Sequence, residues 1–152
     1  MIRSIAPCDA PAVHGILVES LGYGCDQDVV AHQIEGLSGD PRCISLVYAD
    51  DETGQVHGFV HALRYDTLHN CGGWDVITLG VTPSWQGRGI GKLLLQAVEQ
   101  EALQRGGTFV RLNSRVERTA AHGFYEHLGY TCDKTQKRFI KQLGELAGGD
   151  LA

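Results

Sequence analysis

The strongest regularity in the distribution of apolar and polar residues begins at Ile90. Apolar residues follow it at i+3, i+4, i+7, i+8 and i+12, which places them on one face of a helix. Two glycines, at 106 and 107, come directly after Arg105, and glycine commonly ends a helix. The pattern predicts an amphipathic helix from Ile90 to Arg105.

Three shorter stretches show weaker helical periodicity. Asp9 can cap a helix whose apolar residues repeat as far as Leu21. A second helix is indicated over residues 30–37, and a third over residues 117–128, where apolar side chains share one side before Gly129. Together with the helix from Ile90, the chain is predicted to contain four helices.

Stretches rich in β-branched and aromatic residues alternate with these helices. They are "IRSIA", "CISLVYA", "VHGFVHALRY", "WDVITLGV" and "TFVRLN", and a final hairpin is expected from "YTCD" and "KRFIKQL". The resulting order, β-α-α-β-β-β-α-β-α-β-β, indicates one α/β (α+β) domain with a mixed sheet. We assign this domain to residues 1–143 and expect residues 144–152 to form a flexible tail.

The composition narrows the classes of protein that need to be considered. With 43% hydrophobic and 20% charged residues it is that of an ordinary globular protein, and no apolar run approaches the roughly 18 residues that span a bilayer. The first residues lack the apolar core of a signal peptide, so a cytoplasmic protein without membrane contact is expected. The formal net charge of −5 argues against nucleic-acid binding and favours a cationic or neutral partner.

No metal site is expected from the cysteine and histidine positions. The five cysteines are widely spaced and include no Cys-x-x-Cys pair, which also argues against a disulfide framework. His57 and His61 lie four residues apart on a predicted strand, and His122 and His127 lie five apart on a predicted helix. Neither spacing brings two imidazoles together.

The segment between the strand that ends at Val81 and the helix that begins at Ile90 contains closely spaced glycines, in "TPSWQGRGIG". A glycine-rich turn that leads into a helix can bind an anion, because the first helical N–H groups have no partner and the helix dipole favours negative charge. The spacing fits neither the dinucleotide fingerprint nor the Walker A loop. A purely structural turn stays open at this point.

Three motifs in order resemble the GNAT superfamily of acyl-CoA N-acyltransferases. Gln86, Gly89 and Gly91 match its Gln/Arg-x-x-Gly-x-Gly/Ala loop, "LGVTP" resembles its fourth strand, and "AAHGFYEHLGY" resembles its last helical motif. The similarity covers residues 74–130. It implies a mixed, mostly antiparallel sheet of about seven strands flanked by four helices.

The resemblance implies acetyl-CoA as co-substrate and assigns the residues that would bind it. The pantetheine arm would lie along the fourth strand at Leu79 and Val81, with a bulge expected at Gly80. Further candidates come from the far wall of the site, where Arg118 replaces the asparagine that is frequent in the family. The loop and wall candidates are Gln86, Gly87, Arg88, Gly89, Ile90, Gly91, Lys92, Asn113, Ser114, Arg118 and Ala121.

The same resemblance assigns the chemistry. Tyr125 would protonate the departing thiolate, and the main-chain N–H of Val81 would stabilise the oxyanion. Asp75 occupies the place of a catalytic glutamate in several relatives, whereas Thr78 can only hydrogen-bond. His61 and bulk water are the alternative bases.

The sequence thus predicts an N-acetyltransferase that acts on the primary amine of a small molecule. A peptide N-terminus or a lysine side chain is the alternative acceptor within the enzymes, and a hydroxyl acceptor is also open. A non-catalytic acyl-CoA sensor module is the alternative from another class. The resemblance also allows a homodimer.

Overall fold

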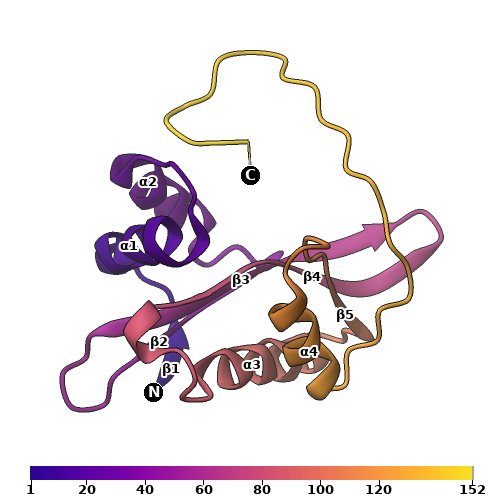
Figure 1. The fold of residues 1–152 in the computed structure, drawn as a ribbon, viewed down its shortest axis with the longest axis horizontal. Coiled ribbons are helices and arrows are strands. Elements are labelled where there is room, and N and C mark those ends of the chain that lie inside the picture. The colour runs from indigo at the N-terminus through magenta and orange to yellow at the C-terminus, as the bar shows by residue number, and fades with distance from the viewer. Residues whose placement is uncertain (152) are drawn as a thin grey trace.

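The fold is a five-stranded sheet with helices on both faces (Figure 1). The computed structural model describes residues 1–151. The strands are β1 (Ile2–Ser4), β2 (Cys43–Ala49), β3 (Val56–Thr67), β4 (Asn70–Val81) and β5 (Phe109–Leu112), in the spatial order β1-β2-β3-β4-β5. All neighbours are antiparallel except β4 and β5, which run parallel. The predicted mixed, mostly antiparallel α/β class is confirmed.

Within the described residues, four helices cover the sheet. They are α1 (Ala10–Leu21), α2 (Gln27–Leu37), α3 (Ile90–Gln104) and α4 (Thr119–His127), with short 3-10 turns η1 (Pro7–Asp9) and η2 (Pro83–Trp85). Helices α1 and α2 pack on one face of the sheet, and α3 packs on the other (Figure 1). The helix predicted from Ile90 to Arg105 is confirmed to within one residue, because its signal is entirely local.

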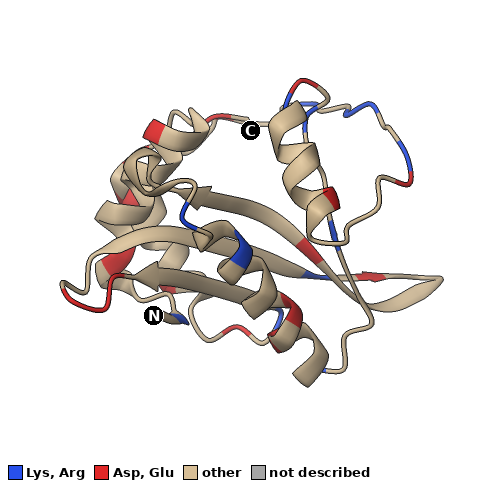
Figure 2. Ribbon diagram, turned by 60° about the horizontal axis from the view of Figure 1, so that its bottom comes forward, with Lys and Arg blue, Asp and Glu red and all other residues tan. Residues whose placement is uncertain are grey.

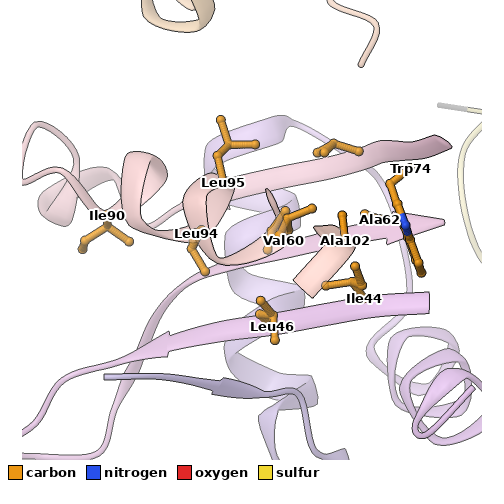
Figure 3. Close-up of a cluster of buried hydrophobic side chains, with 11 residues drawn as sticks. Ile44, Leu46, Val60, Ala62, Trp74, Ile90, Leu94, Leu95 and Ala102 are labelled. Carbon is orange, nitrogen blue, oxygen red and sulfur yellow. The ribbon is translucent and has the colours of Figure 1, made fainter. Parts of the chain in front are cut away.

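The larger core lies between the sheet and α3. Residues of β2, β3 and β4 that alternate along each strand face the apolar stripe of α3, as Figure 3 shows. Trp74, Leu94, Leu95 and Val98 are fully buried there. The apolar residues at every second position of the strands and those at helical spacing after Ile90 therefore form the two sides of one interface.

Asp9 plays a different role from the helix cap that the sequence predicted. Its carboxylate accepts hydrogen bonds from both terminal nitrogens of Arg3 and from the backbone N–H of Ala6, each at 2.8 Å, and does not cap α1. Asp9 is buried, and Arg3 lies in β1. The ion pair therefore fixes the start of α1 to the edge strand.

The bulge in β4 lies at Ile77, not at Gly80 as predicted. The β3–β4 register shifts between His61 and Ala62, which leaves Ile77 unpaired and 51% exposed, whereas Gly80 pairs regularly with Phe59. Gly80 is glycine for another reason. A Cβ at this position would lie 2.7 Å from Cγ2 of Ile16, so α1 can cross β4 closely only because the side chain is missing.

The predicted final hairpin is wrong, and the sheet has five strands instead of about seven. Within residues 130–147 the structure contains no strand pairing. Phe139 and Leu143 are 89% and 90% exposed. A hairpin needs a sheet or helix to cover it, and the far end of this segment is held elsewhere: Asp150 bonds the N–H of Gly24, and Cys25 forms a bridge with Gly149. The tail expected over residues 144–152 includes this contact, and Ala152 lies outside the described residues.

Replacing Leu94 with alanine is expected to lower the free energy of unfolding by about 2–5 kcal/mol, because the side chain is fully buried and leaves a cavity between α3 and the sheet. Leu93→Ala provides the matched control, since Leu93 is the next residue and 45% exposed. Denaturant unfolding of both variants checks this. Equal losses would mean that the contact of α3 with the sheet is not the main source of stability.

Candidate active site

Strands β4 and β5 separate after a short paired region. Their parallel pairing covers Gly73–Val76 of β4 and Phe109–Leu112 of β5 and stops at the bulge residue Ile77. From there to Val81, β4 has β3 on one side only among the described residues. We call this part of β4, Ile77–Val81, the splayed segment.

The backbone of the splayed segment presents unpaired hydrogen-bonding groups. The N–H of Thr82 donates to the carbonyl of His57 at 2.8 Å, and pairs along an antiparallel ladder alternate between bonded and non-bonded. Val81 and Leu79 therefore occupy non-bonded positions opposite Gly58 and Val60. Their N–H groups point away from β3, toward the side that β5 leaves open.

The carbonyl of Val81 is engaged on this open side. It accepts hydrogen bonds from Ser20 Oγ at 2.8 Å and from Gln86 Nε2 at 3.1 Å. Gln86 thus closes the loop back onto β4, while Ser20 ties the end of α1 to the same carbonyl. The N–H groups of Leu79 and Val81 remain available to a ligand that lies along the strand.

The glycine loop connects the splayed segment to α3. Gly87 and Gly89 have φ of +77° and +80°, a conformation that other residues rarely adopt, and a Cβ on either would meet no atom within 4 Å. Gly89 is the N-cap of α3, so the first N–H groups of the helix face the same open region. Backbone conformation and free space both fit an anion at this point.

Two cations accompany the loop. Arg88 and Lys92 are exposed, and in the part of the chain that the structure describes neither forms an ion pair. The guanidinium of Arg88 lies over the ring of Trp85 at 4.4 Å. Trp85 in turn stacks on His57, with ring centroids 3.7 Å apart.

The opposite wall contains the other predicted cofactor residues. Ser114 Oγ is buried without a hydrogen-bond partner among residues 1–151, and a buried hydroxyl of this kind calls for a ligand or water. Asn113 is exposed, and its Oδ1 accepts a hydrogen bond from Arg111 at 3.0 Å. Arg118 precedes α4 and is exposed, while Ala121 in the first turn of α4 is half-buried.

Tyr125 lies on α4, which is packed against the start of α3. A Cβ on Gly91 would lie 3.2 Å from Cζ of Phe124, so the two helices are close at this point. The half-buried Tyr125 ring contacts Phe124 and Tyr130 edge-on, and its hydroxyl has no hydrogen bond to any described residue. Burial raises the pKa of Tyr125, partly offset by the positive charge of Arg118. The phenol is therefore protonated at neutral pH and free to donate.

Tyr130 differs from Tyr125. Its hydroxyl donates to Glu99 Oε1 at 2.9 Å, and burial together with this acceptor raises its pKa. The hydroxyl proton of Tyr130 is therefore already used in a hydrogen bond to Glu99 of α3. Of these two neighbouring phenols, only Tyr125 is free to act on a ligand.

Asp75 lies on β4 directly beside β5, within the paired region. Its carboxylate is 3.7 Å from the guanidinium of Arg111, its register partner on β5. Burial raises the pKa of Asp75, and the charge of Arg111 opposes this. The carboxylate is thus desolvated but still partnered by a cation.

His61 lies on β3 opposite Thr78 of β4. Its Nδ1 is 2.8 Å from the hydroxyl of Ser45 on β2, and burial lowers its pKa. A neutral imidazole with one nitrogen hydrogen-bonded can accept a proton at the other. Both predicted bases therefore belong to neighbouring strands of one sheet.

The sequence did not predict three residues that contact candidate site residues: Arg111, Trp85 and Ser45. Arg111 shifts the pKa of Asp75, Trp85 supports Arg88, and Ser45 bonds His61. No motif includes them, and each acts through a contact with another element. Only the pairing of β4 with β5 and of β2 with β3 could have indicated the first and third.

Charge is unevenly divided between the two halves of the molecule. Residues 4–41, which include α1 and α2, contain six acidic residues and no lysine or arginine, whereas ten of the 13 cations lie in residues 88–141. Figure 2 shows the basic residues gathered around the loop before α4 and along the segment after it. The half of the chain that contains the glycine loop and α4 is thus basic, and the half that contains α1 and α2 is acidic.

Within residues 1–151 no three His, Cys, Asp or Glu side chains come together as they would around a metal ion. No described helix has the length and apolar character to cross a bilayer.

Comparison with known proteins identifies the fold and its relatives. The profile of the acetyltransferase (GNAT) family matches residues 11–130. An aminoglycoside N(6')-acetyltransferase type 1 of Stenotrophomonas maltophilia is 31% identical over an alignment of 134 residues that covers 85% of this chain and 84% of that protein. A mycothiol acetyltransferase of Gordonia bronchialis is 31% identical over 74% of this chain, but the match spans only 34% of that relative's length.

Solved structures agree on the fold. AAC(6')-Iy in complex with the bisubstrate analogue CoA-S-monomethyl-acetylneamine superposes with a TM-score of 0.79 at 20% identity, covering 93% of this chain and 97% of the other. An acetyltransferase of Trypanosoma brucei gives a TM-score of 0.76 at the same identity and covers 93% of this chain and 99% of its own. The resemblance drawn from the sequence motifs is confirmed.

Replacing Arg111 with glutamine is expected to raise the pKa of Asp75, because it removes the positive charge that opposes the effect of burial. NMR titration of the Asp75 carboxyl carbon measures the shift. Arg42→Gln removes the same charge from an exposed pair with Asp40 and should leave Asp75 unchanged. An unchanged or lower pKa in Arg111→Gln would show that this ion pair does not persist in solution.

Proposed function

The chain belongs to the acetyltransferase (GNAT) family, and we propose that it transfers the acetyl group of acetyl-CoA to a primary amine of a small molecule. The observation that carries this proposal is the splayed segment: unpaired N–H groups of Leu79 and Val81 lie next to a glycine loop at the start of α3. An extended amide-containing arm fits the strand, and a diphosphate fits the helix start.

The residues on both sides of the splayed segment fit acetyl-CoA. The loop offers main-chain donors, with open space at Gly87 and Gly89, and Arg88 and Lys92 add two positive charges that form no ion pair with a described residue. On the other wall Ser114 has a buried hydroxyl in need of a partner, with Asn113, Arg118 and Ala121 nearby along the chain. We assign the arm to Leu79 and Val81 and the diphosphate to the loop.

Acetyl-CoA supplies a thioester whose carbonyl carbon is attacked by the acceptor nitrogen while the bond to sulfur breaks. The N–H of Val81 stabilises the negative charge on the carbonyl oxygen. Tyr125 donates its phenolic proton to the departing thiolate, and because burial raises the pKa of Tyr125 the phenol is protonated at neutral pH before the step. No step requires a metal ion.

The acceptor amine must lose a proton before it can attack, since amines are mostly protonated at neutral pH. We assign this step to Asp75, through water, because burial raises its pKa and so makes it a better base than an exposed carboxylate. His61 is the alternative base. If Asp75 acts, the acid limb of the pH profile follows its pKa and moves to higher pH in Arg111→Gln.

The acidic surface of α1 and α2 favours an acceptor with several positive charges. Glu19, Asp26, Asp28 and Glu35 are exposed, and in the described chain none forms an ion pair. Ser20 places the end of α1 at Val81, next to the proposed reaction centre. The relative named as an aminoglycoside N(6')-acetyltransferase is consistent with a polycationic small molecule. A peptide acceptor and a non-catalytic acyl-CoA sensor are the alternatives.

Calorimetric titration with acetyl-CoA, with NADH and ATP as controls, tests the cofactor assignment first. Saturable binding of acetyl-CoA alone is expected, followed by turnover with amines that carry two or more ammonium groups. Turnover only on peptides would replace the small-molecule acceptor, and binding without any turnover would favour the sensor. A folded protein that does not bind acetyl-CoA would contradict the proposal.

Replacing Tyr125 with phenylalanine is expected to lower kcat roughly ten- to a hundredfold with little change in affinity for acetyl-CoA, because it removes a proton donor and keeps the ring. Tyr130→Phe is the matched control, since that hydroxyl is bonded to Glu99 and should affect stability more than kcat. Steady-state kinetics combined with calorimetry separate the two effects. Unchanged turnover in Tyr125→Phe would remove Tyr125 from the mechanism.

A further inference from the structure

Three side chains form a continuous stack beside the glycine loop. The rings of His57 and Trp85 are 3.7 Å apart and inclined by 11°, and the guanidinium of Arg88 covers the Trp85 ring at 4.4 Å. The stack thus runs from a strand, through a 3-10 turn, to the glycine loop. None of the sequence motifs includes His57 or Trp85.

The inner two layers are held firmly. His57 is 6% exposed in β3, and its carbonyl accepts the N–H of Thr82 at 2.8 Å. Trp85 is half-buried at the end of η2. Its backbone N–H donates to the carbonyl of Thr82, and its indole ring packs against the larger core between the sheet and α3. The indole therefore presents a fixed flat surface to the loop.

The outer layer is free to bind an anion. Arg88 is exposed and has neither a hydrogen bond nor an ion pair with any residue in 1–151. Stacking uses the face of the guanidinium and leaves the N–H groups on its rim available. An arginine without such support would lose the freedom of several bonds on binding a ligand.

We propose that His57 and Trp85 are positioning residues that hold the Arg88 guanidinium in place for the diphosphate of CoA before the cofactor binds. This inference rests on the proposed function, since it takes CoA as the ligand of the loop. Trp85 acts directly on Arg88, and His57 acts by fixing the indole plane.

The surroundings of His57 are consistent with a neutral ring in the stack. Burial lowers the pKa of His57, with Arg88 acting in the same direction and Asp50 opposing it. Glu19 of α1 lines the same hollow of about 380 Å³ as His57 and Trp85. A neutral imidazole adds no second positive charge on the opposite side of the indole, so it does not repel Arg88.

A double-mutant cycle on the affinity for CoA, measured by calorimetry, tests the proposal. Trp85→Leu is expected to weaken binding about three- to tenfold, since it removes the support of the guanidinium. Arg88→Ala should weaken binding at least as much, and the double variant should be no weaker than Arg88→Ala. Trp85→Phe keeps a flat ring and should restore most of the affinity, while His57→Leu should give a smaller loss than Trp85→Leu.

Arg42→Ala is the matched control, because it removes one exposed arginine far from the loop and should leave CoA affinity unchanged. Thermal unfolding checks that each variant is folded. If Trp85→Leu does not fold, Trp85→Phe and His57→Leu take its place. The CoA affinity of each is then measured with and without Arg88→Ala, and the losses are again compared for additivity. Additive losses in the cycle would overturn the proposal.

The failure of this inference is distinguishable from that of the proposed function. If the natural protein does not bind CoA, both fail. If it binds CoA and Trp85→Leu binds equally well, the stack has no positioning role while the proposed function stands.

Discussion

Strand β4 is paired on both sides only as far as Val76, and everything at the candidate site depends on the separation that follows. The bulge at Ile77 ends the pairing with β5 while the ladder with β3 continues to Val81. In a sheet interior, unpaired N–H groups would be costly, so their persistence here indicates that a ligand or water completes them. The loop, α3 and α4 are all arranged around this incomplete edge.

The separation of β4 from β5 also explains how helices α1 and α3, which pack on opposite faces of the sheet, both come close to the splayed segment. Helix α1 crosses β4 at Gly80 on one face and bonds the carbonyl of Val81 through Ser20. Helix α3 follows the splayed segment after η2 and the glycine loop and packs on the other face, with α4 packed on its first turn. The acidic and basic halves of the chain therefore meet at Val81, where the proposed function needs an amine and an anionic cofactor to meet.

Local signals were enough to predict the fold class, α3, and the glycine loop from the sequence. The period of the apolar residues after Ile90 and the glycines at 87 and 89 act within a few residues of each other, and the structure follows them closely. Glycine in a strand often marks a bulge and so predicts one at Gly80, yet Gly80 allows the close approach of Ile16 from helix α1. The final hairpin had correct strand composition, but its formation depends on a covering surface that composition does not describe.

The residues of the candidate site also divide into those that local sequence signals predict and those that depend on contacts between elements. Residues that we propose to bind through backbone, such as Leu79, Val81 and Gly89, could be predicted because a motif fixes main-chain conformation. The side chains that tune the site, Arg111 beside Asp75 and Trp85 beneath Arg88, could not, because Arg111 meets Asp75 through the pairing of β4 with β5, and the Trp85 ring stacks on His57 of the distant strand β3. Motifs therefore predict where a cofactor would bind, whereas contacts between elements decide how basic Asp75 is and how Arg88 is supported. Differences in activity between relatives with the same loop are expected to arise from side chains such as Arg111 and Trp85.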